Sequence, residues 1–469
     1  MFDSSTPELA VAQIIFWALL PFALLAPPRW AVLSWLIMGN LDATEPGFSS
    51  ASSFGWINVV KGVGIPLVLW MRLGNAPSRV LNTVPAKLWI GLAAYASVAA
   101  LWTPFPLAAV KLVGSMAGIL ITILVLEKAA RTGLLTGTVL SLLICSTILL
   151  GVFQTYYFGG LVYGYDGPDQ QARFSSFIHA QQYAAILVAF FTLILWREQL
   201  RQVQRLVLGL ATLAALALNG SRTWFIGAII AAIVFCFISF RRVALIAAFG
   251  VASVSLAALA LANLTSGDID WLSEAPSRIV ATSKALLSGE DTAQRAGLRN
   301  LSFRFIVYDG VVEELRSAGP RELIFGHGTS SGGTVSLRLF PHVYNADHLD
   351  PNRTIHNEWL RALYEWGLVG LALLVSVFGS LTVGVVRAYR ESAWKPPYAA
   401  LLSFLPAFLA ALSTENIIAG VGNAVTFSLA LLIGLLFVPP PRRSSAAECL
   451  LPVRSIRFEE GRIALTARP

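Results

Sequence analysis

The sequence predicts an all-α membrane protein with about 12–14 transmembrane helices and one large loop outside the membrane. Of its 469 residues, 56% are hydrophobic and only 13% are charged, and the mean hydropathy is +0.68. Soluble domains are only ~45–50% apolar and carry ~25% charged residues. Apolar runs in this chain reach the ~20 residues that a helix needs to cross a bilayer. The composition therefore excludes a soluble domain.

The apolar runs define the elements in order along the chain. A span-length window predicts helices at 10–26, 29–40, 56–71, 87–102, 106–126, 134–156, 179–196, 205–219, 222–240, 243–263, 358–384, 396–416 and 423–438. We therefore divide the chain into N-terminal transmembrane helices at 1–263, a loop subdomain at 264–357, C-terminal transmembrane helices at 358–440 and a basic tail at 441–469. The first apolar stretch lacks a charged n-region and a cleavage site, so we expect it to remain as an anchor.

Basic residues set the predicted orientation. They fall in alternate short loops, which the positive-inside rule places in the cytoplasm together with the tail. These residues are Arg72, Arg79, Lys87, Lys128, Arg131, Arg197, Arg201, Arg205, Arg241, Arg242, Arg387, Arg390 and Lys395. The loop 157–178, the short turn at Asn219-Gly220-Ser221 and the segment 264–357 then face outward. The net charge of +8 follows largely from this bias and does not indicate nucleic-acid binding.

A histidine stands where the outward segment becomes a helix. His356 and Asn357 directly precede the apolar span that begins at Glu358. The eleven-residue step from His356 to Gly367 returns to nearly the same helix face about three turns deeper, and Gly370 lies about one turn beyond it. Two glycines on one face predict a place where a second helix could pack closely.

Further basic groups gather near the outward surface. Arg173, His179 and Arg222 lie at outward loop ends, and Lys61 and Lys111 lie about one turn below the outward ends of their spans. Together they would surround a shallow cavity suited to an anionic headgroup, above all a diphosphate. For the lysines the alternative is snorkelling toward the interface, and for His179 it is capping the start of a span.

Two acidic residues near this surface have structural interpretations. Glu415, near the outer end of its span, is predicted to pair with an arginine, because an unpaired carboxylate at that depth is costly. Glu365 lies nine positions after His356, hence on the opposite helix face, where it can pair with Arg361.

These residues resemble the O-antigen ligase and polysaccharide polymerase family of bacterial inner membranes. The resemblance rests on His356-Asn357 followed after nine residues by Gly367-Leu-Val-Gly370, and covers the chain from about Arg173 onward. Its other parts are Leu323-Ile324-Phe325-Gly326-His327-Gly328, Arg304 in Ser302-Phe303-Arg304-Phe305, Gly-Ser-Arg222-Thr, and Arg173-Phe-Ser-Ser-Phe-Ile-His179.

The resemblance implies a metal-independent glycosyltransferase of the GT-C type, without a cofactor. Such an enzyme moves a glycan from undecaprenyl diphosphate to an acceptor hydroxyl at the periplasmic face, in ligases on lipid A-core. His356 would be the general base, and the forks of Arg173 and Arg222 would hold the diphosphate, with Arg304 a third candidate. Lys61, Lys111, His179 and Asn357 would contact substrate, whereas Gly367, Gly370 and Glu415 would be structural. A single displacement would invert the anomeric carbon, since no outward pair of carboxylates is placed for a retaining reaction.

Three alternatives remain open. A repeat-unit or exopolysaccharide polymerase would use the same chemistry on a growing glycan. A lipid-linked glycan flippase would also carry membrane-embedded basic residues, but at several depths along a cavity. A metal site could form from His342, Asp347, His348, Asp350 and His356, although their spacing matches no defined metal pattern.

Overall fold

The computed structural model describes the following residues: 7–41, 56–74, 77–159, 174–178, 180–196, 202–238, 299–340, 355–418, 424–439, 457–459 and 462–464. The chain divides into two compact units, Met1–Val438 and Pro439–Pro469. In the described part of the second unit, β1 (Arg457–Glu459) pairs antiparallel with β2 (Arg462–Ala464), and Phe458 stands opposite Ile463.

The regular elements described in the first unit are all helices. In the N-terminal half they are α1 (Pro7–Leu25), α2 (Pro28–Met38), α3 (Trp56–Val59), the π-helical turn η2 (Val60–Gly64), α4 (Ile65–Arg72), η3 (Val80–Asn82), α5 (Val84–Ala99), η4 (Ala100–Trp102), α6 (Pro106–Arg131), α7 (Gly137–Phe158), α8 (Ala180–Trp196), α9 (Gln202–Asn219) and α10 (Arg222–Ile238). They continue with α13 (Arg299–Ser317), α14 (Pro320–Phe325), α15 (Gly333–Leu339), α16 (Glu358–Glu391), α17 (Pro396–Leu412) and α18 (Ala424–Leu435).

The predicted all-α fold class is confirmed for the first unit, whose described elements are all helical, and the chain is a multi-pass membrane protein. A helix occupies each predicted span except 243–263, which lies outside the described residues. Among the described residues, five helical stretches are long and apolar enough to cross a membrane: Val84–Trp102, Pro106–Arg131, Gly137–Phe158, Gln202–Asn219 and Glu358–Glu391. Shorter apolar stretches of 10–17 residues lie in α1, α8, α10, α17 and α18.

Local sequence explains where several helices begin and end. Proline occupies the first turn of α2, α6 and α17, where its missing N–H costs no hydrogen bond. Thr136 caps α7 by accepting a hydrogen bond from Val139 N, and Gly159 ends that helix in the left-handed conformation, with φ 74°.

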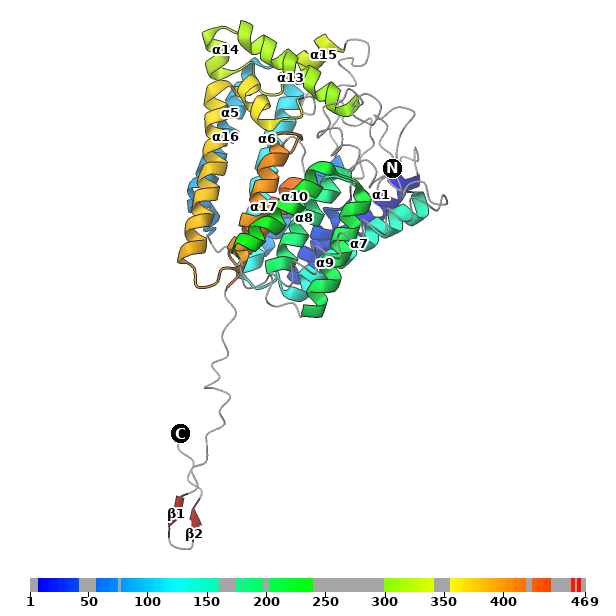
Figure 1. Ribbon diagram of the computed structural model, residues 1–469, viewed down its shortest axis with the longest axis vertical. Helices are drawn as coiled ribbons and strands as arrows, with labels where there is room; N and C mark the ends of the chain where they lie inside the picture. Colours follow the sequence, from blue (N-terminus) through cyan, green and yellow to red (C-terminus); the bar gives the residue numbers. More distant parts are fainter. Residues whose placement is uncertain are drawn as a thin grey trace. The chain divides into compact units, whose positions relative to one another are not determined.

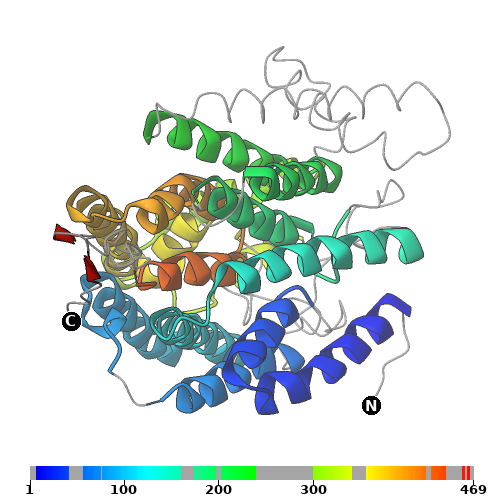
Figure 2. The ribbon, with the colours of Figure 1, turned by 90° about the horizontal axis from the view of Figure 1, so that it is seen from below.

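Small residues and aromatic rings build the core. A Cβ added to Gly227 would lie 2.9 Å from Ala407 Cβ, so α10 and α17 meet closely there. The Trp224 ring, also on α10, stacks on Phe404 of α17 at 6.0 Å between centroids. Helix α18 packs against α6 on one side and α8 on the other, and in Figure 2 it lies centrally between the blue N-terminal helices and the green ones.

Helix α16 is the longest described element and carries the predicted site at its N-terminal end. It has 34 residues and is interrupted at Gly367, whose backbone is not helical. It packs along α5 and α17, and α13, α14 and α15 lie across its N-terminal end (Figure 1, top). Arg387 and Arg390 lie near its other end. The predicted general base and this basic cluster are therefore at opposite ends of one helix.

Candidate functional site

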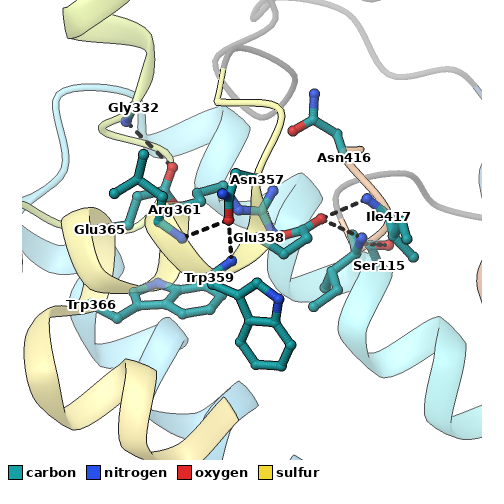
Figure 3. Close-up of polar contacts among 12 residues, drawn as sticks. Ser115, Gly332, Asn357, Glu358, Trp359, Arg361, Glu365, Trp366, Asn416 and Ile417 are labelled. Carbon is teal, nitrogen blue, oxygen red and sulfur yellow. Dashed lines mark hydrogen bonds and ion pairs between the residues drawn. The ribbon is translucent and has the colours of Figure 1, made fainter. Parts of the chain in front are cut away.

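The site is built around the first turn of α16. Asn357 is the N-cap residue, and its Oδ1 accepts hydrogen bonds from Trp359 N at 3.1 Å and Leu360 N at 3.0 Å (Figure 3). These bonds satisfy two of the amide groups that every helix start leaves without an intrahelical partner. Asn357, predicted as a substrate contact, thus uses its side-chain oxygen to begin the helix, and His356 immediately precedes it.

His356 is partly buried and is held by two other elements. Its Nδ1 lies 3.1 Å from Asn416 Nδ2, in the segment that follows α17. Its carbonyl oxygen accepts a hydrogen bond of 2.5 Å from the hydroxyl of Tyr308, on α13. Burial raises the pKa of Tyr308 to about 12, so this hydroxyl keeps its proton at neutral pH and donates it. His356 is therefore held through its backbone by α13 and through its ring by the segment after α17.

A buried carboxylate binds the same segment after α17. Glu358 is 1% exposed, and its Oε1 accepts hydrogen bonds from Ile417 N at 2.6 Å and Ile418 N at 2.7 Å. Its Oε2 forms an ion pair with Arg361, one turn along α16. Figure 3 shows Glu358 reaching from the start of α16 to the backbone of Ile417. The helix start and the segment after α17 are thus joined by charge-assisted hydrogen bonds.

Arg304 and Glu415 form an ion pair beside this segment. Arg304 Nη1, on α13, lies 3.4 Å from Glu415 Oε1 and donates to Thr414 O at 2.5 Å. Glu415, for which the sequence predicts an arginine partner, therefore has one. The guanidinium of Arg304, predicted as a substrate contact, fixes the chain directly before Asn416.

The two glycine motifs of the sequence meet at a break in α16. Gly367 has φ 63° and ψ −163°, and Gly326, directly after α14, has φ 79° and ψ 178°. Glycine alone adopts this region readily. A Cβ on Gly367 would lie 2.3 Å from Ile324 O, at the end of α14. The element against Gly367 is thus the end of the short helix α14 and the loop after it.

The break frees backbone oxygens of α16 to bind that loop. His327 N donates to Tyr364 O at 3.0 Å, and Gly328 N donates to Glu365 O at 2.9 Å. The hydroxyl of Tyr95 on α5 donates to Trp366 O at 3.2 Å. Oxygens that a continuous helix would use internally are therefore satisfied by the Gly326-His327-Gly328 loop and by α5.

Glu365 and Gly370 complete this junction. The fully buried carboxylate of Glu365 accepts hydrogen bonds from Ser330 N at 2.8 Å and from Gly332 N at 3.3 Å. Figure 3 shows the bond from Gly332. A Cβ on Gly370 would lie 2.0 Å from Trp366 Cβ, so glycine makes room for the buried indole there. Glu365 thus stabilises the packing of the α14–α15 loop against α16, and Gly370 accommodates the Trp366 side chain.

Of the two predicted membrane lysines, Lys61 is buried. It is 4% exposed, lies in the π-helical turn, and donates from Nζ to Leu41 O at 2.6 Å. Leu41 in turn pairs with Phe177 in an isolated bridge. Lys111 is half-buried on α6, one turn before Ser115, whose Oγ donates to Ile418 O at 2.8 Å.

Three other predicted residues are described only through their neighbours. Arg173 and His179 lie outside the described residues, and Arg222 begins α10 with a side chain that also lies outside them. Asn219 Nδ2, three residues before Arg222, donates to Phe174 O at 2.7 Å and to Ala180 O at 2.9 Å. The turn before Arg222 is therefore tied to the residues that directly follow Arg173 and His179.

The structure adds polar residues that the sequence interpretation missed, namely Asn219, Tyr308, Glu358 and Asn416. Each is a polar residue on α13 or near the end of an apolar helix, and this position was the only feature of the sequence that could have pointed to it. As for a metal, no group of three or more His, Cys, Asp or Glu side chains is suitably placed among the described residues. His342, Asp347, His348 and Asp350 of the alternative metal site lie outside them.

Comparison with known proteins agrees with the motif resemblance. Residues 206–375 match the O-antigen ligase family. The matched stretch contains Arg222, Arg304, the Gly326-His327-Gly328 loop, and α16 from its capping residues through Gly370. No curated protein sequence matches the chain. The predicted family resemblance is thus confirmed for this part of the chain, and Asn416 lies beyond it.

Proposed function

We propose that this membrane protein transfers a glycan from undecaprenyl diphosphate to an acceptor hydroxyl at the periplasmic face of a bacterial inner membrane, because its residues 206–375 match the O-antigen ligase family. The acceptor in this proposal is the lipid A-core. The observation that carries the proposal is the placement of His356: a histidine in the matched domain, held by α13, by the α16 start and by the segment after α17.

The charge distribution along α16 supports a periplasmic site. Arg387 and Arg390 near its C-terminal end and Lys395 just beyond it belong to the basic set that the positive-inside rule assigns to the cytoplasm. His356 stands at the other end of α16. On this basis we assign α13, α14 and α15 to a periplasmic subdomain within residues 264–357 and the tail 441–469 to the cytoplasm.

In the proposed reaction His356 is the general base. The acceptor oxygen attacks the anomeric carbon, and His356 Nε2 takes the proton from that hydroxyl. The bond from the anomeric carbon to the phosphate oxygen breaks, its electron pair stays on the phosphate, and undecaprenyl diphosphate leaves. One displacement inverts the anomeric carbon. An imidazole suits this task because its ordinary pKa of about 6.5 is close to physiological pH.

The contact with Asn416 supports this role if the carboxamide presents its oxygen. For Nε2 to act as the base, Nδ1 must carry the ring proton, and an acceptor must face it. A half-turn about the Cβ–Cγ bond of Asn416 exchanges the two ends of its carboxamide and places Oδ1 toward Nδ1. Asn416 then orients the ring and selects its tautomer.

We assign the diphosphate to Arg222 and Arg173. A diphosphate is a good leaving group, so the protein mainly has to hold its charge, and planar guanidinium forks bind phosphate oxygens in pairs. The bonds from Asn219 to Phe174 and Ala180 support a common location for Arg173, His179 and Arg222. Lys111 is a further headgroup contact, whereas Lys61, bonded to Leu41 O, would support the wall of the site.

The proposal is tested with purified protein in lipid vesicles, supplied with radiolabelled undecaprenyl-diphosphate glycan and with lipid A-core. We expect the label to become covalently attached to lipid A-core. Label that appears instead in longer lipid-linked glycans would identify a polymerase with the same chemistry. Lipid-linked glycan that crosses the bilayer chemically unchanged, with no covalent product, would identify a flippase and contradict the proposal.

A further inference from the structure

We propose that Glu358 is a positioning residue of the transfer reaction: its carboxylate holds the Asn416–Ile418 segment against the start of α16 and thereby aligns Asn416 with His356. This inference rests on the proposed function and adds to it a residue that does not itself contact substrate. The link from Glu358 to the imidazole runs through the backbone of Ile417 and Ile418 to Asn416.

The carboxylate of Glu358 fixes the segment at two consecutive amide groups. Both bonds to Oε1, from Ile417 N at 2.6 Å and Ile418 N at 2.7 Å, are buried. The carbonyl oxygen of Ile418 accepts from Ser115 Oγ on α6 at 2.8 Å. The backbone N and O atoms of Ile418 are therefore bonded to two different helices, which holds the peptide groups on both sides of this residue.

This anchoring determines where the neighbouring Asn416 side chain lies. Asn416 directly precedes Ile417, and its carboxamide reaches the Nδ1 atom of His356 at 3.1 Å. His356 precedes Glu358 by two residues on the other side of the contact. Chain connectivity and hydrogen bonds thus form a closed ring from His356 through Glu358, Ile417 and Asn416 back to His356. A small ring of this kind holds a catalytic group within the narrow geometry that proton transfer requires.

Helix capping does not account for Glu358. An acidic residue in the first turn of a helix ordinarily stabilises the free amide groups of its own helix. Here Asn357 already accepts from Trp359 N and Leu360 N, and Glu358 is directed to a separate segment. The ion pair with Arg361 offsets part of the cost of burying this carboxylate. Glu358 is therefore used to join two parts of the site.

A double-mutant cycle tests the inference. The variants are Glu358→Gln, Asn416→Ala and the combination of both. Glu358→Gln keeps the size of the side chain but removes the negative charge that strengthens its hydrogen bonds to Ile417 N and Ile418 N. Steady-state transfer is measured in purified protein, with folding verified by size exclusion and thermal unfolding. We expect Glu358→Gln to lower kcat about tenfold with KM within about twofold, because alignment and not binding is lost. In the Asn416→Ala background the same change should lower kcat by less than about twofold.

The matched control is Glu391→Gln on the same helix. Glu391 pairs with Arg387 at the opposite end of α16, with a side chain 68% exposed, and its replacement should leave kcat unchanged. Two outcomes would overturn the inference. In one, Glu358→Gln lowers kcat by the same factor with and without Asn416→Ala, and in the other it changes KM alone. Neither outcome would contradict the role of His356 as general base. An inactive wild-type protein in the same assay would instead refute the proposed function itself.

Discussion

Among single residues, arginine and lysine differ in the geometry of their charged groups, and this difference allows the role of Arg222 to be tested. Arg222 is proposed to grip the diphosphate with two parallel N–H donors, an arrangement that a lysine ammonium cannot reproduce. We expect Arg222→Lys to lower kcat/KM for the lipid-linked glycan by at least about 100-fold, as measured by initial rates. Arg387→Lys, at the exposed opposite end of α16, serves as the control. Wild-type rates in Arg222→Lys would reduce Arg222 to an interfacial anchor.

The hydroxyl of Tyr308 gives a prediction on stability and pH. Its bond to His356 O contributes about 1 kcal/mol, so Tyr308→Phe should unfold at a lower temperature than the wild type. Burial raises the folded pKa of Tyr308 from 10.0 to about 12, so its contribution is fully present below pH 10 and is lost as the pH rises through 12. The difference in unfolding temperature should stay constant from about pH 7 to 9.5 and shrink above that range. A difference that changes near neutral pH would rule out this bond as its origin.

The position and the pairing of a site residue could be predicted from the sequence only where they depend on its neighbours along the chain. The position of His356 at a helix start follows from hydropathy, and the need of Glu415 for a cation follows from its depth. The partners of His356 and Glu358 could not be predicted, because Asn416 and Ile418 are each sixty residues distant along the chain. The packing of α16 against α17 in the folded protein brings them together.

At the scale of elements, the break in α16 is the feature with the clearest consequence. Gly367→Ala places a Cβ 2.3 Å from Ile324 O in a backbone region nearly restricted to glycine. We expect a loss of more than about 3 kcal/mol of stability and loss of transfer, because the α14–α15 loop can no longer dock. Thermal unfolding and transfer assays measure both effects.

Gly379→Ala is the matched control on the same helix, since a Cβ there meets nothing within 4 Å. It should stay within about 1 kcal/mol of the wild type. Equal stability and activity of the two variants would mean that the break at Gly367 is not needed for the fold.

Hydropathy predicts this region as one span, 358–384, because the average hydropathy of a window does not reveal a single residue with a non-helical backbone. The spacing of Gly367 and Gly370 was instead interpreted as a helix-packing face.

At the scale of the whole molecule, the proposed chemistry needs no metal ion. The charge of the leaving diphosphate is assigned to guanidinium groups, and the proton to an imidazole. We therefore expect turnover in vesicles to be unchanged by a chelator such as EDTA. Activity that is lost on chelation and restored by a divalent cation would favour a site that includes His342, Asp347, His348 and Asp350.

The orientation of the molecule and the position of one imidazole together make up the central claim. The most direct measurement is single-turnover glycan transfer by purified His356→Ala and His356→Gln proteins, each shown to be folded and inserted in vesicles. The account predicts that both lose at least about 100-fold in the rate of transfer while still binding the lipid-linked glycan. Transfer at the wild-type rate by either variant would contradict it.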